Sequence, residues 1–206
     1  MRAFVVGLVV ASTFLGGGTA SAHAATCFGS PATITGTPKG DLLVGTPRKD
    51  VIVGFGGDDV IRARGARDLI CARGGDDTVY GGAGSDRILA GGGADEVKGN
   101  RGDDDIMGQR GNDVVRAAAG DDFVSLGTGL DGVAGGFGRD TLEGWEGADQ
   151  MVGGFGNDFM VGGRGNDFLD GSQGSDSIRG GDGIDQCRNG ESIIACEITM
   201  PRRTGR

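Results

Sequence analysis

The feature that most constrains this chain is an aspartate at every ninth residue. The series runs from Asp41 to Asp185 without interruption and places 17 of the 24 aspartates in one phase. The second residue after each of these aspartates is apolar, from Leu43 to Cys187, and the second residue before is glycine in 14 of the 17 repeats. The fifth residue before is glycine or alanine everywhere except at Leu126. The repeat is therefore G-x-x-G-x-D-x-U-x, where U is apolar.

This period excludes some structures and favours others. One apolar residue in nine cannot form the apolar face of an amphipathic helix, which needs one every three or four residues. Glycines allow the backbone positive φ angles and tight curvature. The repeat predicts a glycine-rich six-residue turn followed by a three-residue strand with one inward side chain. A single unit cannot bury that side chain alone, so we expect an all-β solenoid of stacked units with two short-strand sheets.

Stacking brings the aspartates close together. If two repeats form one coil, aspartates 18 residues apart lie about 4.8 Å apart, the spacing of neighbouring strands. Two columns of carboxylates follow, one containing Asp77 and Asp95 and the other Asp86 and Asp104. Like charges at this distance repel strongly unless cations hold them. Carboxylates together with backbone carbonyls suit calcium, which takes six to eight oxygen ligands in flexible geometry, better than magnesium.

The nonapeptide resembles the repeat of the RTX (repeats-in-toxin) family of calcium-binding β-rolls, also known as haemolysin-type calcium-binding repeats. The resemblance covers about residues 37 to 189. It implies a right-handed parallel β-roll that holds multiple Ca²⁺ ions between turns of alternate repeats. The motif carboxylates and the carbonyls of the glycine turns would be the ligands. The expected metal ligands are Asp59, Asp77, Asp86, Asp95, Asp104, Asp113, Asp122, Asp131, Asp140, Asp149, Asp158, Asp167, Asp176 and Asp185.

The first repeats depart from the pattern. Those at residues 37–45 and 46–54 begin with Thr-Pro instead of Gly-x, and Lys39 and Arg48 replace the turn glycine. Because a cation in the turn competes with Ca²⁺, we expect these sites to be weak or empty. The strongest sites are expected between Gly75 and Gly183, where the turn glycine is unbroken. Phe55 and Trp145 occupy the second glycine position of their repeats.

The ends of the chain differ from the repeats. Residues 1–24 combine Arg2, an apolar run and small residues, which is the pattern of a secretory signal peptide. Residues 25–36 are expected to form an N-terminal cap that places Ile34 at a core position. The β-roll of about 17 repeats covers 37–189, and 190–206 are expected to form a C-terminal cap and basic tail. The apolar run is too short to span a membrane.

Four cysteines in an exported chain suggest two disulfides, for which three pairings are possible. We favour Cys27 with Cys71 and Cys187 with Cys196. The second pair lies only nine residues apart, on opposite sheets of an ideal coil. The last coil must therefore depart from ideal geometry to bring the two Cα atoms within about 7 Å.

The sequence favours a binding protein over an enzyme. The only histidine, His23, lies in or beside the signal peptide, so HExxH and Ser-His-Asp sites are not expected. Residue count alone leaves a carboxylate-pair glycosidase open, but each in-phase aspartate already has a metal-binding explanation. The net charge of −9 argues against nucleic acid as a partner. We expect a secreted, extracellular calcium-binding protein that folds on binding calcium. The alternative is an adhesion, matrix or surface-recognition module on the same β-roll, with an unidentified extracellular partner.

Overall fold

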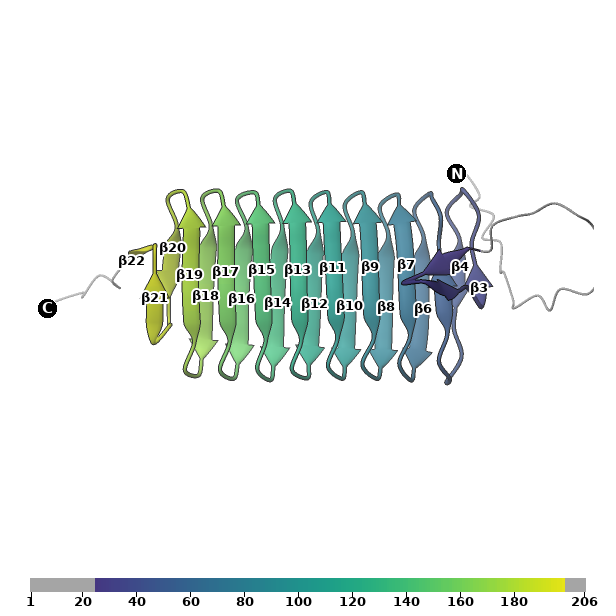
Figure 1. Cartoon of the computed structure of the whole chain (residues 1–206), viewed down its shortest axis with the longest axis horizontal. Coiled ribbons are helices and arrows are strands. Elements are labelled where there is room, and N and C mark those ends of the chain that lie inside the picture. The colour runs from purple at the N-terminus through teal and green to yellow at the C-terminus, as the bar shows by residue number, and fades with distance from the viewer. Residues whose placement is uncertain (1–24, 199–206) are drawn as a thin grey trace, which may run out of the picture.

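The computed structural model describes residues 25–198, and within this range the chain is all-β, without a helix. The strands wind into a β-solenoid of about nine turns, and each turn contributes one strand to each of two parallel sheets (Figure 1). This architecture confirms the solenoid that the nine-residue period predicts.

The two main sheets contain ten strands each, in the order of the coils. The odd sheet contains β3 (Ile34–Thr35), β5 (Val51–Val53), β7 (Leu69–Gly74), β9 (Arg87–Gly92), β11 (Asp105–Arg110), β13 (Phe123–Thr128), β15 (Thr141–Glu146), β17 (Phe159–Arg164), β19 (Ser177–Asp182) and β21 (Ser192–Ile194). The even sheet contains β4 (Leu42–Val44), β6 (Val60–Gly65), β8 (Thr78–Ala83), β10 (Glu96–Arg101), β12 (Val114–Ala119), β14 (Gly132–Phe137), β16 (Gln150–Phe155), β18 (Phe168–Gln173), β20 (Gln186–Arg188) and β22 (Glu197–Ile198).

Neighbouring strands of a sheet are two repeats apart. Val79 pairs with Val97 in the even sheet, and Ile88 pairs with Ile106 in the odd sheet. Each residue thus lies beside the residue 18 positions further along the chain. The same register holds from β4 to β18 in the even sheet, which confirms that two repeats make one coil.

The strands are longer than the sequence predicts. From β6 to β19 they span six residues instead of three, because the glycine-rich segment after the apolar strand also joins the sheet. In β8 the pairing skips the fourth residue, Gly81, and the fifth, Gly82, has a left-handed φ of +117°. The strand therefore bends in its middle and continues, and the turn proper is only three residues long.

The core is a single column of apolar side chains between the two sheets. The U residues from Leu43 to Cys187 are buried, and 12 of the largest core side chains are almost completely inaccessible. The fourth residue of the six-residue strands also points inward, where Ala90 and Leu126 pack into the same cluster. Leu126 fits without disturbing the pairing of β13 with β11 and β15.

At the N-terminal end, Ile34 begins the core column and pairs with Ile52. The preceding residues form an antiparallel hairpin of β1 (Thr26–Cys27) and β2 (Ser30–Pro31). This hairpin packs on the outer face of β5 and β7, where Val51, Val53 and Leu69 form a second, smaller core. The disulfide between Cys27 and Cys71 fixes it there. The hairpin therefore covers a side face of the first coils.

At the C-terminal end the last coil is shorter than the others. Ser177 pairs with Ser192, 15 residues on, where the preceding coils advance by 18. This shortening brings Cys187 and Cys196 into a disulfide with their Cα atoms 5.8 Å apart. Both predicted disulfides are thus confirmed, as is the expected departure of the last coil from ideal geometry.

Candidate metal centre

The in-phase aspartates form two buried columns, one beside each row of turns. The N–H of Asp77 donates to Oδ1 of Asp95 over 2.8 Å, and the N–H of Asp86 donates to Oδ1 of Asp104 over 2.8 Å. The same bond recurs from coil to coil up to Asp185. Each carboxylate is therefore fixed in place by the backbone of the preceding coil. The columns that the sequence predicts are confirmed.

The second oxygen of these carboxylates is buried and has no hydrogen-bond partner among the described residues. Burying a charged oxygen without a partner is costly, so 15 such atoms in one small fold require an explanation. They are Oδ2 of Asp59, Asp68, Asp77, Asp86, Asp95, Asp104, Asp113, Asp122, Asp131, Asp140, Asp149, Asp158, Asp167, Asp176 and Asp185.

Backbone carbonyls converge on the same places as these unpaired oxygens. A Cβ added to Gly81 would lie 2.7 Å from Oδ2 of Asp86 and 2.9 Å from the carbonyl oxygen of Gly99 on the next coil. At Gly108 the corresponding oxygens belong to Asp113 and Leu126, at 2.5 and 2.6 Å. In the ten of these 15 turns that have glycine here, the missing Cβ leaves free a small space that faces a carboxylate oxygen and a carbonyl oxygen, whereas the other five turns have alanine or Leu126 at this position.

The electrostatics of the columns favour a cation. Burial raises the pKa of Asp68, Asp77 and Asp104 from 3.8 to about 7; the backbone hydrogen bond opposes this shift, and neighbouring aspartates add to it. Asp113, Asp140 and Asp149 also have a pKa of about 7, while the pKa is about 6 for Asp59, Asp86, Asp95 and Asp122 and raised for Asp131, Asp158 and Asp167. A column of ionised carboxylates is therefore unfavourable without a bound cation.

The donor set indicates which cation fits. Within residues 25–198 there is no group of three or more His, Cys, Asp or Glu side chains that could hold a metal. An ion in the columns would therefore complete its shell with backbone carbonyls in addition to the Asp Oδ2 atoms. Calcium accepts this mixture of carboxylate and carbonyl oxygens, whereas zinc prefers nitrogen and sulfur ligands.

The first two in-phase aspartates are different. Oδ2 of Asp41 accepts hydrogen bonds from the N–H and Oγ1 of Thr37 over 2.6 and 2.8 Å. Oδ2 of Asp50 accepts the same pair of bonds from Thr46 over 2.6 and 3.0 Å. Here the protein itself satisfies the oxygen that is unpaired elsewhere. The expectation that these two turns bind calcium weakly stays a prediction, and the threonines supply a second reason for it besides Lys39 and Arg48.

Backbone conformation explains why a threonine satisfies the Oδ2 atom in these two turns and not in the other 15. The fourth residue before the aspartate has a left-handed φ in all 15 turns with an unpaired Oδ2, including non-glycine residues such as Asn100 (+81°) and Ala118 (+91°). Thr37 and Thr46 are not left-handed. Each precedes a proline, which favours an extended conformation for the residue before it. The extended threonine can then direct its N–H at the carboxylate.

All 14 aspartates expected from the sequence have the buried, unpaired Oδ2, and the structure adds Asp68 to them. Its repeat has Ala66 in place of the turn glycine, but Ala66 adopts the left-handed φ of +77° that the turn requires. The normal phase of Asp68 and its apolar partner Ile70 were the signals that could have included it. The off-phase Asp58 is instead exposed and accepts the N–H of Asp76 over 2.9 Å, outside the buried columns.

Comparison with known proteins agrees with this geometry. A family model of the RTX calcium-binding nonapeptide repeat, which describes four copies, matches residues 35–70, 72–97, 98–133, 127–160 and 152–187. The chain belongs to this RTX repeat family. The RTX repeats imply a calcium-binding β-roll, in accordance with the two columns. No curated protein matches the chain. Among the residues that the structure describes, no helix is long and apolar enough to cross a membrane.

Proposed function

We propose that this RTX protein is secreted and that its β-roll folds when it binds several calcium ions. The observation that carries this proposal is the set of 15 buried Oδ2 atoms, each without a hydrogen-bond partner among the described residues. Bound calcium would supply the positive charge that offsets the repulsion within each column. The columns exist only when the coils are stacked, so the free energy of binding becomes free energy of folding.

In this proposal different atoms position the carboxylates and bind the ion. The Oδ1 atoms and the backbone N–H groups set the position of each carboxylate, for example Asp95 against Asp77. The Oδ2 atoms and the neighbouring carbonyls, such as that of Gly99, would hold the ion. Because every ion would join two coils, loss of one site is expected to weaken the stacking of its neighbours.

Secretion is supported by two features. Residues 1–24 have the pattern of a signal peptide, although they lie outside the described residues. The disulfides Cys27–Cys71 and Cys187–Cys196 are typical of proteins in oxidising compartments. In this proposal low cytosolic calcium keeps the chain unfolded before export, and extracellular calcium folds it. The role is one of binding, and no catalytic step is assigned to the roll.

The proposal is tested by far-UV circular dichroism of the protein without residues 1–24, with its disulfides intact. After EGTA treatment the protein is titrated with CaCl₂, and MgCl₂ serves as the control. We expect a cooperative gain of β signal with calcium alone. A spectrum that is already fully folded in EGTA and does not respond to calcium would contradict the proposal.

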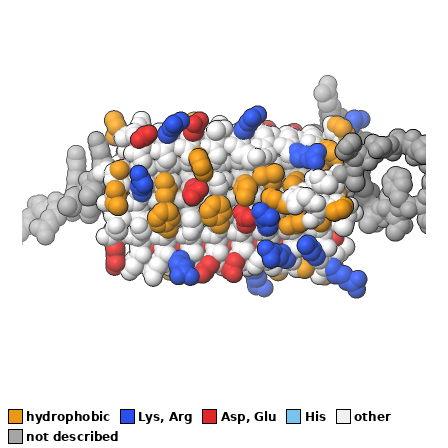
Figure 2. All heavy atoms as spheres, in the orientation of Figure 1, with side chains coloured by type: hydrophobic (Ala, Val, Ile, Leu, Met, Phe, Trp, Pro, Cys, Tyr) orange, Lys and Arg blue, Asp and Glu red, His pale blue; other side chains and the backbone are white. Residues whose placement is uncertain are grey.

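A second candidate function, surface recognition, is favoured by the aromatic side chains on the outside of the roll. Phe137 and Phe155 stack on neighbouring coils with ring centroids 4.8 Å apart, although 62% and 48% of their surfaces are exposed. Figure 2 shows apolar side chains along the middle of one face, interspersed with acidic and basic ones. This function would require the calcium-loaded roll, so the two candidates are compatible. Calcium-dependent retention of the protein on an extracellular surface, lost in a Phe137→Ser/Phe155→Ser variant, would support it.

A further inference from the structure

The only tryptophan of the chain lies on the outside of the roll. Trp145 is the fifth residue of β15, at a position where seven of the 17 repeats have glycine, and has a left-handed φ of +76°. Its side chain is 57% exposed. The left-handed φ is common to this position in all 15 turns with an unpaired Oδ2, so what distinguishes Trp145 is its large aromatic side chain. The solvent-exposed indole gains little from burial.

An equivalent residue elsewhere in the chain shows what can cover an aromatic ring at this position. Phe55 also lies four residues before its in-phase aspartate, and Arg73 follows it 18 residues later, on the next coil of the same sheet. The guanidinium carbon of Arg73 lies 4.7 Å from the centroid of the Phe55 ring. An arginine from the neighbouring coil therefore covers this exposed aromatic ring.

The same pairing recurs on other outer rings. Arg87 covers Phe28 at 4.1 Å from the ring centroid, and Arg188 covers Phe168 at 4.9 Å. Tyr80 lies between two cations, with Arg62 at 5.7 Å and Lys98 at 5.0 Å. Cations on ring faces are attracted by the negative face of the π system, and tryptophan is the strongest partner among the aromatic residues.

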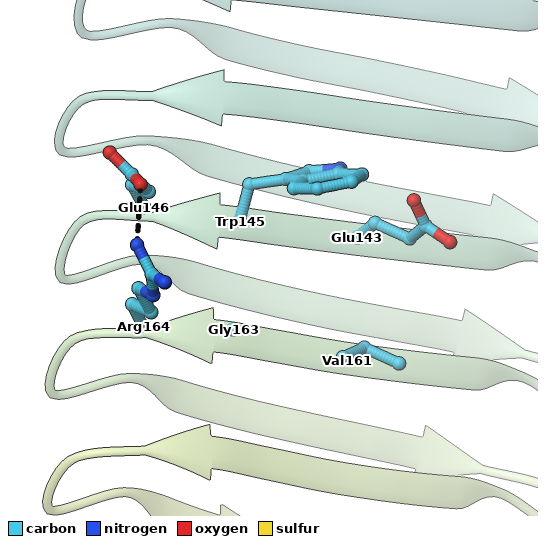
Figure 3. Close-up of a pocket in the computed structure, with 6 residues that line it drawn as sticks. All are labelled: Glu143, Trp145, Glu146, Val161, Gly163 and Arg164. Atoms are coloured by element: carbon cyan, nitrogen blue, oxygen red, sulfur yellow. Dashed lines mark hydrogen bonds and ion pairs between the residues drawn. The ribbon is translucent and has the colours of Figure 1, made fainter.

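Trp145 lacks such a cation within the described residues. The residue 18 positions on is Gly163, which pairs with Trp145 and has no side chain to cover the indole. A hollow of about 440 Å³ lies here, lined by Glu143, Trp145, Glu146, Val161, Gly163 and Arg164. Figure 3 shows the indole extending along β15 toward Glu143, with the strand at Gly163 beside it free of side-chain atoms.

The charges around the hollow are complementary to a cation. Nη1 of Arg164 is paired with Oε1 of Glu146 over 3.0 Å, so these two charges offset each other. Glu143 has no ion-pair partner among residues 25–198, and in Figure 3 its carboxylate lies near the far end of the indole. The hollow thus combines an open aromatic face with one uncompensated carboxylate.

We propose that this hollow binds the guanidinium group of an arginine side chain from a basic extracellular partner. The guanidinium occupies the place over Trp145 that Arg73 occupies over Phe55, and Glu143 accepts its hydrogen bonds. A planar guanidinium can stack on the indole and bind a carboxylate at the same time, which an ammonium group does less well. This inference deepens the recognition function and rests on a roll folded by calcium.

The fluorescence of Trp145 tests this site directly, because no other tryptophan contributes. The calcium-loaded protein is titrated with N-acetyl-arginine amide, and N-acetyl-citrulline amide, which has nearly the same shape without the charge, is the matched control. We expect a saturable change in fluorescence with arginine in the millimolar range and about two- to fivefold weaker binding of citrulline, which lacks the charge of a solvent-exposed cation–π contact. Equal responses to the two ligands, or no saturable response to arginine, would overturn the proposal.

Two variants locate the ligand. Glu143→Gln should weaken arginine binding about two- to fivefold, the range of a partly exposed ion pair. Glu96→Gln, which removes a carboxylate from β10 on the opposite sheet, should leave it unchanged. Equal affinity of Glu143→Gln and the unsubstituted protein would overturn the assignment. Circular dichroism of the same samples separates the two proposals: an absent response from a folded roll overturns the arginine site alone, whereas an unfolded protein in calcium overturns the calcium proposal beneath it.

Discussion

The first two in-phase aspartates and the 15 that follow them share a backbone ladder but differ in one respect. In both groups the aspartate N–H donates to the next Oδ1 of its column, as from Asp41 to Asp59 and from Asp95 to Asp113. In the first group a threonine also satisfies Oδ2, whereas in the second group Oδ2 is buried without a partner among the described residues. The coil geometry and the need for a metal are therefore separate properties. The residue four positions before the aspartate determines whether the Oδ2 atom is left without a partner, and so whether the turn needs a metal.

The N-terminal coils have additional support that needs no metal. The hairpin of β1 and β2 packs on Val51, Val53 and Leu69, and the disulfide to Cys71 ties it to the third strand of the odd sheet. We therefore expect these coils to be the most stable part of the calcium-free protein. The remaining coils can then add to them when calcium binds.

The largest expected effect is that protonation of the buried aspartates stabilises the coils of the second group when calcium is absent. The pKa of Asp68, Asp77 and Asp104 is about 7 in the folded roll, above the ordinary value of 3.8. A raised pKa in the folded state means that the stabilisation is complete below about pH 4 and is lost as the pH rises through about 6 to 7. In EGTA we expect β signal near pH 4.5 and its loss by pH 8, measured by circular dichroism. Light scattering at each pH distinguishes folding from precipitation.

A β signal in EGTA that increases with pH would contradict this account of the columns. Calcium binding should have the opposite pH dependence to the stability of the calcium-free roll. Ligand carboxylates must lose their protons to bind the ion, so the calcium affinity should fall as the pH is lowered through 7 to 6. The affinity is measured by isothermal titration calorimetry at several pH values.

Removing one aspartate from each group sharpens the comparison. Asp113→Ala deletes a proposed metal ligand and leaves the N–H of Asp95 without its acceptor, so we expect a loss of at least about 2 kcal/mol in the free energy of unfolding in calcium. In Asp41 the Oδ2 atom already accepts hydrogen bonds from Thr37. Asp41→Ala should therefore leave the number of bound calcium ions unchanged and reduce the free energy of unfolding by less than Asp113→Ala does. Equal losses of bound calcium from both variants would show that the two groups do not differ.

The hydrogen bonds from Thr37 and Thr46 predict a smaller effect, which concerns the stability of the calcium-free protein and not calcium binding. Thr46→Val removes the Oγ1 donor to Asp50 and should destabilise the calcium-free N-terminal coils by about 1 kcal/mol. Thr78→Val is the matched control, because Thr78 lies on β8 and its hydroxyl makes no hydrogen bond within the described residues. Urea unfolding in EGTA measures the difference. If both variants are equally stable, the threonine hydroxyl does not replace the metal.

The smallest effect concerns the space beside the carboxylates. A Cβ at Gly162 would collide with Oδ2 of Asp167 and with the carbonyl of Gly180, so Gly162→Ala should weaken calcium binding a few-fold. Gly132→Ala should have no effect on affinity, because nothing lies within 4 Å of the added carbon. Unchanged affinity in Gly162→Ala would mean that the ion does not depend on this arrangement of oxygens.

The sequence predicted the features that depend on period alone. The phase of the aspartates and of the U residues determines the two columns, the core from Leu43 to Cys187 and the pairing of residues 18 apart. The two disulfides do not follow from the period: they were favoured among three possible pairings, and Cys187–Cys196 required the last coil to depart from the ideal geometry. The columns, the core and the pairing are repeated from coil to coil, so local irregularities do not disturb their prediction.

Features set by single residues were harder to predict. The strands were expected to be three residues long, because residues such as Gly82 and Ala83 were assigned to the turn, yet these two residues still pair across coils. The bonds of Thr37 and Thr46 depend on one backbone angle, which the Thr-Pro pair only suggests. The placement of the hairpin on β5 and β7 depends on the outward apolar side chains of Val51 and Leu69, which the repeat does not specify.

Hydrogen–deuterium exchange of the disulfide-bonded protein, followed by mass spectrometry in calcium and in EGTA, tests the central claim most directly. In calcium we expect protection along all strands from β5 to β19. In EGTA we expect the amides from Asp59 onward to lose protection, while those of residues 32–53 keep part of theirs. Uniform protection of the whole roll in EGTA would contradict the claim that the unpaired Asp Oδ2 atoms make the later coils depend on calcium.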